Sequence, residues 1–143
     1  MAVEVKRAYE KPTPADGVRV LVERLWPRGI SKQGAALDAW LKDLAPSHAL
    51  RRWYHARPVQ WPLFRKKYLA ELREPLASRA LEELYQMALG NPRLTLVYGS
   101  RDEQHNCAII LKELLEGMRK PPASSGPVGA AAAGGRRRAV RRR

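Results

Sequence analysis

The sequence is a strongly basic chain of 143 residues, with a formal net charge of +13 and a single cysteine. Its length suffices to bury a hydrophobic core, and one cysteine excludes an intrachain disulfide. It shows neither an N-terminal hydrophobic leader nor an apolar run long enough to span a membrane, so we expect a cytoplasmic protein that does not engage a membrane.

Three apolar segments are predicted to form strands. The first is short and weak, the second reads VRVLV and follows the turn-forming sequence PTPADG, and the third reads LTLVY and follows GNPR. The last two are compact apolar runs, which are typical of strands covered on both faces. The three predicted strands span residues 3–7, 18–22 and 94–98.

Helical spacing of apolar residues fills the segment between the second and third strands and recurs after the third. Pro46 and Gly90 end two of these segments, Ser47 opens another, and Pro62 suits a first helical turn. The apolar stripes are Leu37, Trp40, Leu41 and Leu44; Leu50, Trp53 and Tyr54; Trp61, Phe64, Tyr68 and Leu72; Ala77, Leu81, Leu84 and Ala88; and Cys107, Ile110, Leu111, Leu114 and Met118.

This order of elements predicts an α/β fold for residues 1–118, with a small, mainly parallel sheet of about three strands flanked by helices in Rossmann-like layers. Parallel strands place their carboxyl ends at one edge of the sheet, where ligands of open α/β sheets bind. The segments that leave the two stronger strands are RLWPRGIS, residues 24–31, and GSRDEQHN, residues 99–106. We therefore expect them to face each other across a crevice.

The final segment differs in composition from the rest. Residues 119–143 contain eight of the 27 Lys and Arg residues and no acid, which leaves 19 basic and 14 acidic residues, a charge of +5, in residues 1–118. Rich in Pro, Gly, Ser and Ala, the segment is predicted to be a disordered tail. Either it has no selected role, or its arginines contact nucleic acid without sequence preference. Those arginines are Arg136, Arg137, Arg138, Arg141, Arg142 and Arg143.

The predicted crevice is rich in groups that bind anions. Guanidinium groups from Arg24, Arg28 and Arg101 are suited to hold a phosphate or a carboxylate beside the start of the last helix. Trp26 offers a stacking surface, with filling of the edge of the core as the alternative. The candidate ligand-binding residues are Arg24, Trp26, Arg28, Ser100, Arg101 and Asn106.

Asp102 and His105 are three residues apart, so the carboxylate is placed to orient the imidazole for proton transfer. They are the candidate catalytic pair; a solvated start of a helix is the alternative. Two ligands do not make a metal site, and His48 and His55 fall on other predicted helices, so no metal is expected. No cofactor motif is present either.

Structural alternatives remain open for other residues. Ser100 and Glu103 fit a capping box, in which each side chain binds a backbone N–H at the start of a helix. Cys107 shares the spacing of the buried apolar stripe, which favours a buried thiol over a nucleophile.

Three sequence blocks together resemble one known family. RLWPRG, WLKDLAPS and RDEQHN, with their flanks, are similar to the YeaO-like branch of the domain-of-unknown-function family number 488, from about residue 3 to residue 115. The resemblance implies a small cytoplasmic α/β protein and carries no settled activity.

Three functions remain open on the sequence alone. The first is binding of a small anionic ligand in the crevice, with or without turnover. The second is association with nucleic acid through the tail, and the third is an interaction module without chemistry. The oligomeric state is not predicted.

Overall fold

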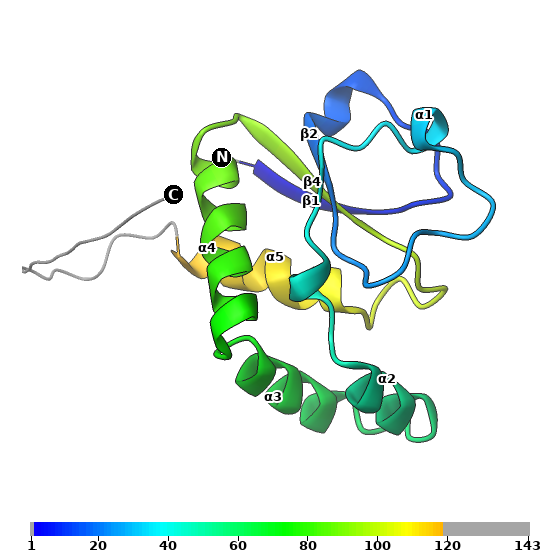
Figure 1. The fold of residues 1–143 in the computed structure, drawn as a ribbon, viewed down its shortest axis with the longest axis vertical. Coiled ribbons are helices and arrows are strands. Elements are labelled where there is room, and N and C mark those ends of the chain that lie inside the picture. Colours follow the sequence, from blue (N-terminus) through cyan, green and yellow to red (C-terminus); the bar gives the residue numbers. More distant parts are fainter. Residues whose placement is uncertain (1, 119–143) are drawn as a thin grey trace, which may run out of the picture.

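The computed structural model describes residues 2–118, which form a four-stranded sheet and five α-helices (Figure 1). The predicted tail, residues 119–143, lies outside the described residues. The elements are β1 (Ala2–Arg7), β2 (Val18–Leu21), α1 (Lys32–Ala35), β3 (Ala39–Trp40), α2 (His48–His55), α3 (Trp61–Glu71), α4 (Pro75–Leu89), β4 (Arg93–Tyr98) and α5 (Cys107–Met118).

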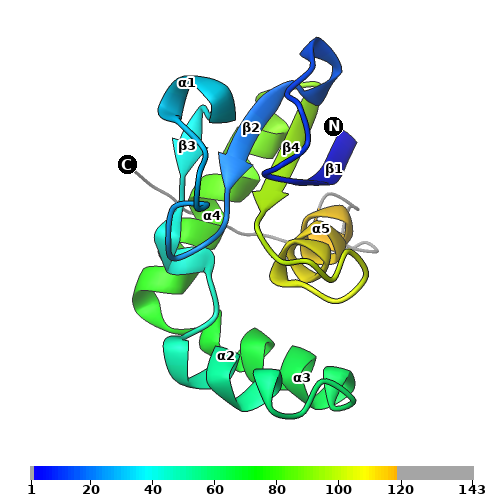
Figure 2. The same cartoon turned by 90° about the vertical axis from the view of Figure 1, so that its right-hand side faces the viewer.

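The sheet is entirely parallel, in the order β1-β4-β2-β3 (Figure 2). The central strand β4 pairs with β1 along its whole length, from Arg93 opposite Ala2 to Tyr98 opposite Arg7, and with β2 on its other side. The predicted fold class, a small parallel sheet flanked by helices, is confirmed.

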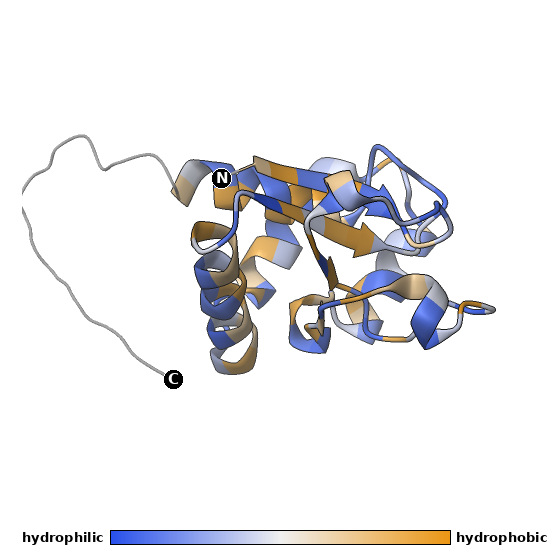
Figure 3. Ribbon diagram, turned by 90° about the horizontal axis from the view of Figure 1, so that it is seen from above, coloured by the Kyte–Doolittle hydropathy of each residue, from blue (hydrophilic) through white to orange (hydrophobic). Residues whose placement is uncertain are grey.

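The two faces of the sheet pack against different parts of the chain. Leu94 and Leu96 of β4 point into the main core, which α3, α4 and α5 complete. Val97 points to the opposite face, where Trp26 and Trp40 meet edge to face with ring centroids 5.4 Å apart. Figure 3 shows the hydrophobic residues concentrated on the strands and on one side of the helices.

Helix boundaries follow their local signals in most places. The Ser47 hydroxyl accepts a hydrogen bond from the Leu50 N–H at 3.1 Å and so caps α2, and Pro62 occupies the first turn of α3. No helix among residues 2–118 is long and apolar enough to cross a membrane.

The helix expected over the stripe from Leu37 to Leu44 is wrong. Ala39 and Trp40 instead pair with Val20 and Leu21 as the short edge strand β3, and a single 3-10 turn follows. An apolar spacing of three and four residues over so short a run is compatible with either structure, and pairing with β2 decides between them.

A buried ionic cluster fastens the segment between β1 and β2. Asp16 is 7% exposed and accepts hydrogen bonds from Lys6 Nζ at 3.0 Å and from Arg19 Nη1 at 2.7 Å. Burial by itself raises the pKa of this carboxyl, but the hydrogen bonds from Thr13, Lys6 and Arg19 outweigh burial and lower the pKa from 3.8 to about 2. The cluster therefore holds Asp16 in its charged form.

Candidate functional site

A pocket of about 520 Å³ lies beyond the carboxyl ends of β2 and β4. The two strand exits are adjacent, because the Val22 N–H donates to the Val97 carbonyl at 3.1 Å and the Gly99 N–H donates to Glu23 Oε2 at 2.7 Å. The sequence analysis predicted a crevice at this edge of the sheet, and the pocket lies at the same edge. The pocket is lined by Glu23, Pro46, Arg51, Tyr54, His55, Pro58, Phe64, Ser100, Arg101, Asp102, His105, Asn106 and Cys107.

The segment after β4 supplies one wall, and it contains five of the eight residues singled out from the sequence. These five are Ser100, Arg101, Asp102, His105 and Asn106. His105 Nδ1 lies 3.4 Å from Asp102 Oδ2, so the expected pairing of the two side chains is present. The pair is open to solvent, since the two side chains are 43% and 52% exposed.

The other three residues, Arg24, Trp26 and Arg28, do not line the pocket. Arg24 Nη2 donates to the Ala45 carbonyl at 3.1 Å, and Arg28 is exposed. The reason is the packing of Trp26 against Trp40 on the opposite face of the sheet, which draws the loop after β2 away from the pocket. The expected meeting of Arg24 and Arg28 with Arg101 is therefore not found.

Helix α2 supplies the opposite wall through Arg51, Tyr54 and His55, none of which the sequence analysis placed in the site. Their spacing of i, i+3 and i+4 puts the three side chains on one face of the helix. Leu50, which is 6% exposed, anchors the helix in the core. His55, which had been assigned to a distant helix, thus shares the pocket with His105.

The pocket has an aromatic side. The rings of Tyr54 and Phe64 lie 4.5 Å apart, and Trp61 stacks on Phe64 at 5.5 Å. His105 lies against Trp61 with ring centroids 4.7 Å apart, which joins the segment after β4 to α3. A ligand in the pocket therefore meets both ring surfaces and charged groups.

Asp102 organises the turn that precedes α5. Its Oδ1 accepts hydrogen bonds from the Gln104 and His105 N–H groups, both at 3.0 Å. The capping box expected at Ser100 and Glu103 is wrong, because α5 begins only at Cys107. The hydrogen bonds to Asp102 close a local turn over residues 102–105, and the chain enters a helix only after it.

Asn106 caps α5 in place of Ser100. Its Oδ1 accepts a hydrogen bond from the Ile109 N–H at 3.1 Å, and its Nδ2 donates to the Asp102 carbonyl at 2.9 Å. We expect Asn106→Ala to lower the free energy of unfolding by about 1 kcal/mol. Urea denaturation measures this change, and a loss no greater than that of Gln104→Ala, an exposed neighbour, would contradict the role of Asn106 as a cap.

The pocket lining holds two arginines and two carboxylates, so its formal charges balance, but the two kinds of group differ in their partners. Glu23 is engaged by the Gly99 N–H and Asp102 by two backbone N–H groups and His105. Arg51 and Arg101, by contrast, form no ion pair with any of residues 2–118. The pocket therefore offers a ligand two guanidinium groups that no carboxylate of residues 2–118 pairs with.

Cys107 is not an available nucleophile. The thiol is 6% exposed and donates to the Val22 carbonyl at 3.6 Å, as the apolar stripe predicted for a buried residue. Burial raises the pKa of the thiol strongly, and the nearby Glu23 carboxylate raises it further. Across residues 2–118, no group of three or more His, Cys, Asp or Glu side chains is arranged to hold a metal ion.

Comparison with known proteins identifies relatives that match about four fifths of the chain. The chain is 39% identical to the uncharacterized protein YeaO of Escherichia coli over 118 residues, which covers 82% of this chain and all of that protein. It is 42% identical to the uncharacterized protein Rv3073c of Mycobacterium tuberculosis over 115 residues, 80% of this chain and 94% of that one. No solved structure is significantly similar.

A family match agrees with these relatives. Residues 2–128 match the family described as the inactive DUF488-N3 subclade, and this span includes every element of the sheet and the pocket. The predicted resemblance to YeaO-like members of family 488 is thereby confirmed. The chain belongs to the inactive DUF488-N3 subclade.

Proposed function

We propose that the pocket binds a small molecule that carries a phosphate or carboxylate next to an aromatic or apolar body. The observation that carries the proposal is the meeting of Arg51, from α2, with Arg101, from the segment after β4, in one hollow beside the rings of Tyr54 and Phe64. Two guanidinium groups without an acidic partner among the described residues favour an anion, and charge-assisted hydrogen bonds would hold it.

The remaining polar groups complete the recognition. His55 and His105 offer hydrogen-bonding nitrogens from opposite walls, and Ser100 and Asn106 lie in the same wall as Arg101 and His105. The raised pKa of Tyr54, caused by burial and then by the charge on Asp102, keeps its phenol protonated and able to donate a hydrogen bond.

Binding without turnover fits this site better than catalysis. The buried Cys107 thiol is protonated, and the Asp102–His105 pair is solvent-exposed rather than held in a dry environment. The description of the family as inactive supports the same reading. Asp102 and His105 would then serve to hold the turn before α5 in the shape that lines the ligand site.

Phenyl phosphate is a suitable probe, because it combines a ring with a dianion. We expect it to raise the melting temperature of the full chain more than inorganic phosphate or phenol does at the same concentration. Loss of a charged hydrogen-bonding partner costs about 1.5–3 kcal/mol, so Arg51→Ala and Arg101→Ala should each weaken binding roughly tenfold to a hundredfold.

Arg52→Ala is the matched control, because Arg52 is the next residue on α2, is exposed and does not line this pocket. We expect it to bind phenyl phosphate like the wild type. Absence of any stabilisation of the wild type, or equal weakening by Arg51→Ala and Arg52→Ala, would overturn the proposal.

A further inference from the structure

The positive charge of residues 1–118 is concentrated in α2, α3 and their flanks. Residues 47–73 contain seven Lys and Arg residues and one acid, a charge of +6, whereas the rest of residues 1–118 contain 12 basic and 13 acidic residues, a charge of −1. The overall charge of this part of the chain thus comes from one helical hairpin. An uneven distribution of this kind is typical of a surface that binds a polyanion.

Most of these charges are not neutralised within the domain. Arg65 pairs with Glu113 at 3.1 Å, and the single acid, Glu71, is occupied by the Ser47 N–H and hydroxyl. Arg51 belongs to the pocket. Five exposed side chains remain with no ion-pair partner among residues 2–118. Arg73 lies beyond the end of α3, and we call the other four the basic face: Arg52, Arg57, Lys66 and Lys67.

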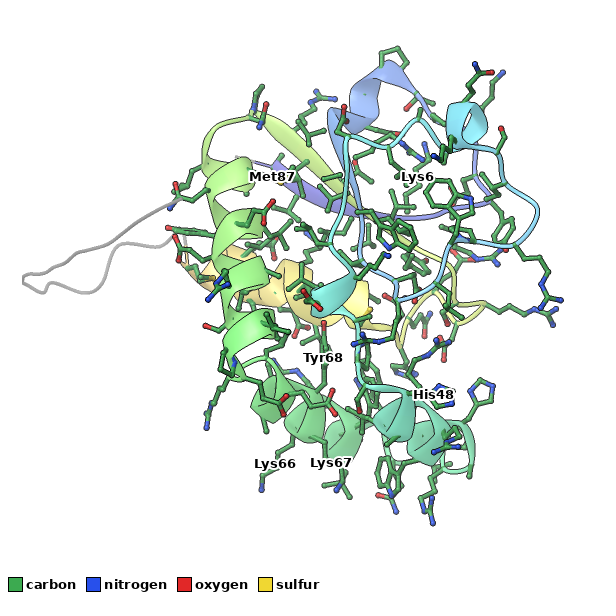
Figure 4. The ribbon with its side chains drawn as sticks, viewed as in Figure 1. Lys6, His48, Lys66, Lys67, Tyr68 and Met87 are labelled. Atoms are coloured by element: carbon green, nitrogen blue, oxygen red, sulfur yellow. The ribbon has the colours of Figure 1, made fainter. Side chains whose placement is uncertain are left out.

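Trp53 joins the two helices of the basic face. The Arg57 guanidinium lies 5.5 Å and the Lys67 ammonium 5.1 Å from the centre of its half-buried ring. Cations from α3 and from the turn after α2 therefore flank one indole and form a continuous surface. Figure 4 shows Lys66 and Lys67 extending from α3 away from the sheet, so they are free to meet a partner.

We propose that the basic face binds the phosphate backbone of a nucleic acid, independently of the ligand pocket. An α-helix rises 1.5 Å per residue, so the 11 residues of α3 extend over about 16 Å, a length over which one strand of duplex DNA presents roughly five charges. The four cations of the basic face, on α2, on α3 and in the turn between them, are comparable in number. Contacts with the backbone alone give binding without sequence preference.

A nucleic acid suits the basic face better than an anionic membrane does. A membrane-binding helix inserts its apolar side chains into the lipid. Here Leu50, Phe64 and Tyr68 of α2 and α3 are buried in the core, and the remaining large apolar side chains of α2 and α3, apart from Leu63, are partly buried against it. Val59 and Leu63 are exposed, yet two residues make too small an apolar surface for insertion.

The test uses the full chain with the six tail arginines, at positions 136–138 and 141–143, changed to glutamine, so that tail binding does not mask the basic face. In this background, Arg52→Gln, Lys66→Gln and Lys67→Gln are combined. The control combines Lys11→Gln, Lys32→Gln and Arg79→Gln, which removes the same charge from exposed sites elsewhere. Circular dichroism verifies that both variants are folded.

Fluorescence anisotropy then measures binding of a labelled duplex and of its single strand at several salt concentrations. For the duplex, losing three phosphate contacts should lower the slope of log affinity against log salt concentration by about 2–3, while the control changes it by less than about 1. Equal slopes for the two variants, or no binding in the background chain, would overturn the proposal. The proposal would also be overturned if the three cations were needed for binding to phosphatidylserine vesicles and not for binding to nucleic acid.

Discussion

Replacing Asp16 with alanine is expected to lower the free energy of unfolding by about 3–5 kcal/mol, the usual cost of removing one partner from a buried ion pair. Arg19 is only 3% exposed, and its Nη1 lies 2.7 Å from Asp16 Oδ2. Without the carboxylate, the guanidinium stays buried next to Lys6 with no negative charge to balance either one. Urea denaturation measures the loss, and Glu4→Ala, an exposed acid of β1, is the control.

The same cluster predicts how stability depends on pH. The folded pKa of Asp16 is lowered from 3.8 to about 2, so its contribution is fully present above the unfolded value and disappears as the pH falls through the folded value. A shift of this size corresponds to about 2 kcal/mol. The difference in stability between the wild type and Asp16→Asn should therefore shrink between pH 5 and pH 2. A difference that stays constant over this range would contradict the ionised cluster.

Leu96→Ala should also be severely destabilising, by about 2–5 kcal/mol. Leu96 is completely buried in β4, opposite Val5 of β1 and Val20 of β2, so no solvent enters to fill the space left by the shorter side chain. Chemical denaturation should show a lower midpoint with an unchanged dependence on denaturant. Leu76→Ala, at a position 61% exposed, should change stability by less than about 0.5 kcal/mol. A comparable loss in both variants would contradict the assigned core.

The sheet was predictable because its evidence is local and its connections obey a general rule. VRVLV and LTLVY are apolar enough to require cover on both faces, and a helical crossover between them makes the strands parallel. Because β2 and β4 are parallel neighbours, their carboxyl ends are adjacent, and the segment after β4 lies beside the end of β2. The structure shows this adjacency in the bond between Gly99 and Glu23.

The edge strand β3 and the start of α5 were not predicted, because in each case two local structures fit the sequence equally well and contacts elsewhere in the fold decide between them. Trp40 satisfies helical spacing equally well, and only pairing with Leu21 makes its segment a strand. Likewise Ser100 is followed by Glu103 in the capping-box pattern, yet Asp102 binds the backbone first and moves the start of the helix to Cys107.

The residues that α2 contributes to the pocket could not be predicted from the sequence, for a different reason. The spacing of Arg51, Tyr54 and His55 shows that they share a helix face, but the direction of that face is set by how Leu50 and Phe64 pack in the core. The loop after β2 presented two arginines and a tryptophan in one short motif. Packing of Trp26 on Trp40 keeps that motif out of the pocket, and Arg51 lines the pocket where Arg24 and Arg28 were expected.

The most direct test of the account is a nuclear magnetic resonance titration of the isotope-labelled full chain with phenyl phosphate. If the pocket binds the anion, the backbone amides of residues 51–55 and 99–107 should shift together and saturate at one common ligand concentration. Arg51→Ala should move both sets of shifts to a ligand concentration roughly tenfold to a hundredfold higher. Shifts confined to one of these two segments, or confined to residues outside both, would contradict a shared anion-binding pocket.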